Sequence, residues 1–193
     1  MAIKHFAKDG FGQIELNQVA FRRDGRVEAQ CKLDATDFAE AYCENGMLLA
    51  VDRANRVVKF PEDDSLPIAL NYSAEHMYDE RALGLKNFAL RREEKFGKLT
   101  TVEGILPRLG YLDIGDKFTT NCIAYDDTEF TTENDLIDAL ENCKETAIYG
   151  GACEDGYIKL SETKPTYGPV LKVVKYTDMP DGQKAVMLIC HKA

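Results

Sequence analysis

The sequence lacks any long hydrophobic run. Its longest apolar stretches, 46–51 and 185–190, have the length of a β-strand, whereas about 20 apolar residues are needed for a helix that spans a bilayer. The first nine residues contain neither an apolar core nor a small-residue cleavage site of the kind that marks a secretory signal peptide. We therefore expect a protein that is made in, and stays in, a cytoplasm until something releases it.

Basic residues are few relative to acidic ones. The 193 residues include 24 Lys and Arg against 33 Asp and Glu, which gives a net charge of -9. Phosphate backbones are bound by net basic faces, so this composition argues against a nucleic-acid partner. Anionic membrane surfaces should also repel the chain, so we expect no membrane partner.

The motifs of common catalytic sites are absent as well. The sequence has no phosphate-binding loop, no dinucleotide-binding glycine motif, no nucleophile elbow and no His-Glu-x-x-His motif. A catalytic triad or dyad would have to use His5, His76 or His191. His76 is the only one in mid-chain, and a surface turn explains it. We therefore expect no enzyme, with no catalytic residue, no cofactor and no metal site.

Two groups of potential metal ligands have simpler explanations. Six cysteines are present, but no two form a Cys-x-x-Cys pair. Most lie among β-type neighbours, so we interpret them as small buried hydrophobic residues, with a metal site on Cys190 and His191 as the alternative. Asp126, Asp127 and Glu129 do not have EF-hand spacing. We interpret them as a helix cap or a solvated turn, with cation binding as the alternative.

The sequence does contain many short β-type segments. Turn residues between such segments predict hairpins. Hairpins are predicted over 14–33, 47–60 and 170–190, and further strands over 68–72, 86–91, 117–124 and 157–160. Because hairpins recur without strand–helix alternation, the predicted fold class is mainly β (α+β), with antiparallel β-hairpins forming a sandwich or barrel.

One main amphipathic helix is predicted around 132–146. Thr131 or Thr132 can cap its N-terminus, and acids lie in its first turn. Apolar residues then recur at helical spacing on one stripe, at Leu136, Ile137, Leu140 and Cys143. This pattern predicts a helix that packs one face against the sheets.

Charge is unevenly distributed along the chain. Residues 124–156 contain ten acidic residues and one basic residue, whereas the first hundred residues are close to balanced. The change of character predicts an N-terminal β-rich docking region, 1–100, and a C-terminal α+β domain, 101–193. Residues 1–13 are expected to form an arm or an irregular lead-in. The alternative explanation of the acidic segment is that it merely improves solubility.

Arg22, Arg23 and Arg26 form a small basic cluster in the first predicted hairpin. On so acidic a chain, such a cluster suits an acidic protein partner better than nucleic acid. We predict these three arginines as partner-binding residues of the docking region.

Three segments of the sequence are the basis of a family resemblance: GDKFTTN at 115–121, YDDTEF at 125–130 and LKVVKYTDMPDGQKAVMLI at 171–189. They resemble small virion proteins of tailed bacteriophages, which are capsid-associated and encoded near the major capsid gene. The likeness covers about 45–189 and transfers no catalytic residue.

The resemblance implies a bacteriophage virion structural protein, synthesised in the host cytoplasm and located on the capsid surface. It would decorate or stabilise the capsid, as a head decoration or head-fibre protein, through contacts with the major capsid protein or neighbouring virion proteins. A homo-oligomer, dimer or trimer, would suit a symmetric capsid. The alternatives are a head–tail connector or other virion component, and a small cytoplasmic ligand-binding domain or enzyme.

Overall fold

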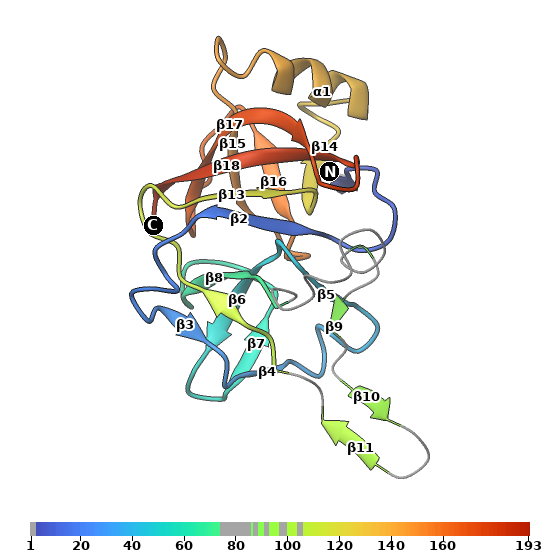
Figure 1. Ribbon diagram of the computed structural model, residues 1–193, viewed down its shortest axis with the longest axis vertical. Helices are drawn as coiled ribbons and strands as arrows, with labels where there is room; N and C mark the ends of the chain where they lie inside the picture. Colours follow the sequence, from blue (N-terminus) through green and yellow to red (C-terminus); the bar gives the residue numbers. More distant parts are fainter. Residues whose placement is uncertain (1–2, 74–85, 87–88, 91–92, 97–99, 104–105) are drawn as a thin grey trace.

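The computed structural model describes residues 3–73, 86, 89–90, 93–96, 100–103 and 106–193. About 40% of the chain is strand, and the described residues include one short helix. Two larger sheets follow one another along the long axis of the molecule, and the helix lies at the far end of the upper sheet (Figure 1). The predicted fold class, mainly β (α+β), is confirmed.

The strands form two larger sheets and two small ones. The upper sheet has the order β1 (Ile3–His5), β14 (Ile123–Asp126), β16 (Ile158–Ser161), β15 (Tyr149–Ala152), β17 (Val170–Asp178), β18 (Lys184–Lys192), β13 (Lys117–Thr120), β2 (Ile14–Gln18). The lower sheet has the order β3 (Val27–Glu28), β12 (Leu109–Gly110), β8 (Ile68–Asn71), β6 (Leu48–Asp52), β7 (Val57–Lys59), β4 (Lys32–Leu33). The small sheets pair β5 (Cys43–Glu44) with β9 (Ala89–Leu90), and β10 (Glu93–Phe96) with β11 (Thr100–Glu103).

Most of these strand pairs are antiparallel, as predicted. Among the described strands, the exceptions are the parallel pairs β14–β16 and β4–β7. The sheets are not closed into a barrel, so the barrel, one of the two predicted arrangements, does not form. In the upper sheet, β1 and β2 are left as the two edge strands.

Two of the three predicted hairpins are confirmed. β6 pairs with β7 around a turn in which Arg56 has a φ of 55°, and β17 pairs with β18 around Gly182 at a φ of 86°. The predicted strands 68–72 and 157–160 correspond to β8 and β16. The strand predicted over 86–91 is described only at β9 and at residue 86, because 87–88 and 91 lie outside the described residues.

The predicted hairpin over 14–33 is wrong. Its turn forms, since the N–H of Arg26 donates to the C=O of Phe21 at 2.9 Å. However, β2 pairs with β13 in the upper sheet and β3 pairs with β12 in the lower sheet. Phe21 is fully buried, so the chain crosses between the sheets where burial of this ring anchors it. The strand predicted over 117–124 is likewise divided, into β13 and β14.

The predicted helix forms as α1 (Glu133–Glu141), which is shorter than 132–146. Thr132 is the cap: its side chain accepts from the N–H of Asp135, whose carboxylate accepts from the N–H of Thr132. The helix ends at Asn142, whose backbone N–H and side-chain amide both donate to the C=O of Asp138, at 3.3 and 2.8 Å.

The N-terminal segment is an irregular lead-in after β1, as one of the two predicted alternatives has it, and it is not a free arm. Of residues 1–13, residues 3–13 are described, and β1 pairs with β14 along its whole length. Phe6, directly after β1, is 2% exposed, and Lys4 donates to the C=O of Thr131 at 2.7 Å. Burial of one phenyl ring and pairing of the backbone therefore hold this segment on the upper sheet.

The hydrophobic core lies within and between the two larger sheets. One cluster combines Phe21, Leu48 and Leu70 from the lower half with Phe118 and many residues of the upper sheet. Strands from both sides of residue 100 occur in each sheet, since β1 and β2 belong to the upper one and β12 to the lower one. The division into 1–100 and 101–193 stays a prediction.

All six cysteines are free and buried, which confirms their interpretation as small core residues. Within the described residues, no helix is long and apolar enough to cross a membrane. The same part of the chain holds no group of three or more His, Cys, Asp or Glu side chains arranged to hold a metal ion.

Candidate functional site: a groove at the junction of the sheets

The three predicted partner-binding arginines lie in the turn between β2 and β3, but they differ in exposure. Arg22 and Arg23 are exposed, and the Nε of Arg23 lies 3.0 Å from the carboxylate of Asp24. Arg26 is turned toward Asp113, with 3.0 Å between its Nη1 and a carboxylate oxygen. Arg22 and Arg23 are therefore better placed to meet a partner, and the role of all three stays a prediction.

Close packing fixes this arginine turn against β12. A Cβ added to Gly110 would lie 2.4 Å from the ring of Phe21, so only glycine allows the ring to approach this closely. The C=O of Arg26 accepts from the N–H of Tyr111 at 3.0 Å. The arginine turn and the residues that follow β12 thus form one continuous piece of surface.

A groove of about 400 Å³ opens directly beside this surface. Four segments form its walls: the approach to β8, the residues after β12, the loop between β16 and β17, and the end of β18. The lining residues are Asp64, Leu66, Pro67, Ile68, Tyr111, Leu112, Pro165, Thr166, Tyr167, Gly168, Pro169, Val170, Lys192 and Ala193. The volume is in the range of about 300–1,000 Å³ that is usual for binding sites.

Two glycines show how tightly the loop between β16 and β17 is packed. Gly168 has a φ of 69°, and a Cβ there would lie 2.8 Å from Ile68. A Cβ at Gly151 would lie 2.3 Å from Pro165. Because neither side has room for another carbon atom, the groove wall is held in one position by both sheets.

The groove is not predicted from the sequence, in which Pro165, Gly168 and Pro169 indicate only a loop before β17. A Tyr between prolines was a signal for a rigid aromatic surface. The partner wall at 64–68 is about a hundred residues away in sequence, so only the tertiary structure brings the two together.

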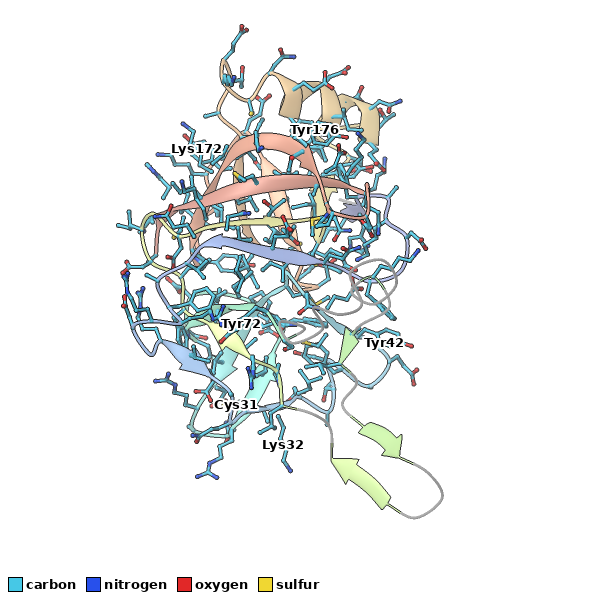
Figure 2. All side chains as sticks on the ribbon, viewed as in Figure 1. Cys31, Lys32, Tyr42, Tyr72, Lys172 and Tyr176 are labelled. Carbon is cyan, nitrogen blue, oxygen red and sulfur yellow. The ribbon has the colours of Figure 1, made fainter. Side chains whose placement is uncertain are left out.

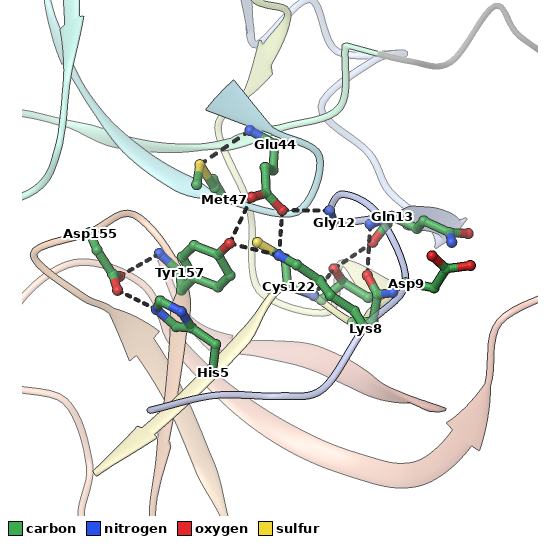
Figure 3. Close-up of polar contacts among 12 residues, drawn as sticks. His5, Lys8, Asp9, Gly12, Gln13, Glu44, Met47, Cys122, Asp155 and Tyr157 are labelled. Carbon is green, nitrogen blue, oxygen red and sulfur yellow. Dashed lines mark hydrogen bonds and ion pairs between the residues drawn. The ribbon is translucent and has the colours of Figure 1, made fainter. Parts of the chain in front are cut away.

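A second polar cluster joins the N-terminal segment to the body (Figure 3). Lys8 and Glu44 form an ion pair with side chains only 11% and 10% exposed. The hydroxyl of Tyr157 accepts from Lys8 at 2.6 Å and donates to Glu44 at 2.7 Å. The N–H of Gly12 donates to the same carboxylate at 2.5 Å. Every charged group of this cluster has partners within it, which is the arrangement of a structural anchor.

His5 lies at the rim of this cluster. Its ring stacks on Tyr157 with 4.1 Å between centroids, and its Nε2 lies 2.7 Å from Asp155. Burial raises the pKa of the Tyr157 hydroxyl far above its ordinary value, and Glu44 raises it further. His191 is exposed, and His76 lies outside the described residues. None of the residues that line the groove is a histidine.

The acidic group at 126–129 spans the end of β14 and the turn before α1. Asp127 and Glu129 are exposed, as expected for a solvated turn, but Asp126 is buried and the cap of α1 is Thr132. Asp126 accepts from the N–H groups of Thr128 and Glu129 at 2.9 and 3.2 Å, and its other oxygen lies 2.9 Å from the Nζ of Lys159. The hydroxyl of Thr128, followed by Lys159, lowers the pKa of Asp126 far below its ordinary value even though burial opposes the shift.

Replacing Asp126 with asparagine is expected to lower the free energy of unfolding at pH 7 by about 2–3 kcal/mol, because charge-assisted bonds are lost. The pKa of Asp126 is lower in the folded state than in the unfolded state. The ionised carboxylate therefore contributes its full stabilisation at pH values above its ordinary pKa, and this stabilisation is lost as pH falls toward the pKa of the folded state. The unaltered protein should therefore lose stability from about pH 5 to pH 2, and Asp126→Asn should lose less. Urea unfolding across this pH range measures both, and the exposed Asp127→Asn is the control. Equal pH slopes for all three proteins would contradict this account.

The comparisons with known proteins do not assign the chain to a family. No protein-family model matches the chain, and neither the curated proteins nor the solved structures give a match.

Proposed function

We propose that this protein is a virion structural protein of a tailed bacteriophage that binds the capsid through protein–protein contacts and has no enzymatic activity. The resemblance of 45–189 to capsid-associated proteins suggests the class of partner. The observation that carries the proposal is the difference between two parts of the surface: one carries exposed acids on α1, and the other combines a groove with exposed apolar groups and charges of both signs.

The acidic part is the end of the molecule that carries α1 (Figure 1). Asp135, Asp138, Glu141 and Glu145 are all exposed there. Carboxylates in water resist close packing against another protein, because burying an unpaired charge costs several kcal/mol. This end is therefore suited to face solvent.

The other part lies at the junction of the two sheets and combines the groove, the exposed arginine turn and an exposed apolar side chain. Ile114, which follows the groove residue Leu112 by two positions, is 70% exposed. Arg22 and Arg23 lie on the adjacent turn. An apolar centre with charged groups around it is the usual composition of a protein-binding surface. We call this surface the docking face.

Co-sedimentation with capsids that lack the protein tests the proposal. The unaltered protein should sediment with the particles, and Arg22→Glu with Arg23→Glu should reduce the bound fraction about tenfold or more, because two attractive charges become repulsive. Lys144→Glu with Lys175→Glu is the matched control, since it changes the charge equally at exposed positions elsewhere. Failure of the unaltered protein to sediment with capsids would overturn the proposal.

The number of copies per particle distinguishes a decoration protein from a head–tail connector. Quantitative mass spectrometry of purified particles should give a simple ratio of this chain to the major capsid protein, such as one or one third. About a dozen copies per particle would instead indicate a head–tail connector.

A further inference from the structure

We infer that the groove binds an extended peptide segment that has a lysine or arginine beside apolar residues. The inference rests on the proposed function for the source of this segment, which is the major capsid protein. The type of ligand follows from the groove itself.

The walls of the groove suit apolar side chains. Tyr111 and Tyr167 provide aromatic rings, and Pro67, Pro165 and Pro169 provide rigid apolar surfaces. Tyrosine and proline lose little conformational freedom on binding, so contacts with them carry a low entropic cost. Grooves lined in this way are a recurring means of recognising extended, proline-containing segments.

Several residues that line the groove are exposed, so the groove is open to solvent, which favours a chain over a small molecule. Asp64, Pro67, Thr166 and Lys192 are lining residues that are themselves exposed. A small-molecule site normally encloses most of its ligand, about 70–90% of the surface. A segment that enters at one end and leaves at the other needs no such enclosure.

Backbone groups in the loop are available for such a segment. Among the described residues, the N–H and C=O groups of Thr166, Tyr167 and Gly168 have no hydrogen-bond partner. Extended peptides bind through main-chain hydrogen bonds of this kind, while pockets select their side chains. The loop thus offers both kinds of contact within three residues.

The charges on one side of the groove favour a cation. Glu62, Asp63 and Asp64 are consecutive exposed acids with no ion-pair partner among the described residues. Asp64 itself lines the groove. Burial raises the pKa of the Tyr167 hydroxyl, the charges of Glu154 and Asp63 raise it further, and Lys159 opposes the shift. A lysine or arginine in the bound segment would pair with these acids. Lys192, at the end of β18, would repel it.

Binding of overlapping synthetic peptides tests the inference directly. Fluorescein-labelled 15-residue peptides that span the major capsid protein would be titrated with the full chain, and anisotropy would be recorded. At least one peptide with a basic residue beside apolar residues should bind. Asp64→Lys and Tyr167→Ala should each weaken its binding about tenfold or more. Lys192→Glu should leave binding unchanged or tighten it, which a merely structural effect on the groove would not do.

Asp138→Lys on α1 is the matched control, since it makes the same charge change at an exposed position far from the groove residues in sequence. Thermal unfolding of each variant identifies any that fail to fold, and Asp64→Lys, in an exposed loop, should melt like the unaltered protein. The inference is overturned if no peptide binds, or if Asp64→Lys and Tyr167→Ala bind as well as the unaltered protein. Loss of co-sedimentation with intact peptide binding would instead count against the proposed function alone.

Discussion

Replacing Glu44 with alanine is expected to lower the free energy of unfolding by about 3–5 kcal/mol. The carboxylate of Glu44 accepts from Lys8, Tyr157 and the N–H of Gly12 in a region where both charged side chains are almost buried. Its removal leaves an ammonium group, a hydroxyl and a backbone N–H without their acceptor. An unpaired buried charge is among the most costly defects that a single substitution can create.

Urea unfolding followed by circular dichroism measures this loss, with two variants for comparison. Glu44→Gln keeps the shape and an acceptor oxygen but removes the charge, so its loss should be smaller. Glu133 accepts a single bond, from the N–H of Ala7 at 3.1 Å, and its alanine variant should lose about 1 kcal/mol or less. If Glu44→Ala lost no more than Glu133→Ala, the cluster would not be the anchor of the N-terminal segment.

Replacing Phe21 with alanine is expected to cost a similar amount, about 3–5 kcal/mol, through a cavity. The ring of Phe21 is fully buried, and its centroid lies 5.1 Å from that of Tyr72, which Figure 2 labels. The ring also fills the space beside Gly110, where a Cβ would lie only 2.4 Å away. Its removal therefore empties a site bounded by the backbone of Gly110 and the ring of Tyr72, which have little freedom to collapse.

A double-mutant cycle with Gly110 makes this prediction specific. Gly110→Ala alone should cost about 1–3 kcal/mol, because the added methyl group overlaps the ring. The same change in the Phe21→Ala protein should cost much less, since the added methyl group then meets a cavity. Phe11→Ala, which removes a partly exposed ring that packs on Tyr42, is the control and should cost less than Phe21→Ala. Additive losses at Phe21 and Gly110 would show that the two do not contact each other in solution.

The site around Phe21 also shows that a local turn signal can predict the turn correctly and the strand pairing wrongly. The Asp24-Gly25 pair is a true turn signal, and the turn forms. The two strands that flank this turn, β2 and β3, do not pair with each other but belong to different sheets. The chain crosses to the lower sheet at Phe21, and nothing in the local sequence distinguishes a turn within one sheet from a crossing between two sheets.

The N-terminal segment also depends on contacts that local sequence does not predict. Gly10 and Gly12 indicate an arm or an irregular lead-in, because glycine disfavours regular structure. In the fold, Gly12 is needed for close packing, since a Cβ there would lie 2.7 Å from the C=O of Asn45. Lys8 reads as a surface residue in the sequence and becomes buried only because Glu44 and Tyr157 are brought to it.

The sequence by itself determined the class of fold, the position of the helix with a cap at Thr131 or Thr132, the confirmed hairpins and the burial of the cysteines. These properties depend on neighbours within a few residues, where propensity, turn chemistry and apolar periodicity act directly. Only the tertiary structure decided the crossing at Phe21, the anchor around Glu44 and the groove beside Tyr167. Each of these joins residues far apart in the chain, and their pairing depends on shape and burial that no local pattern records.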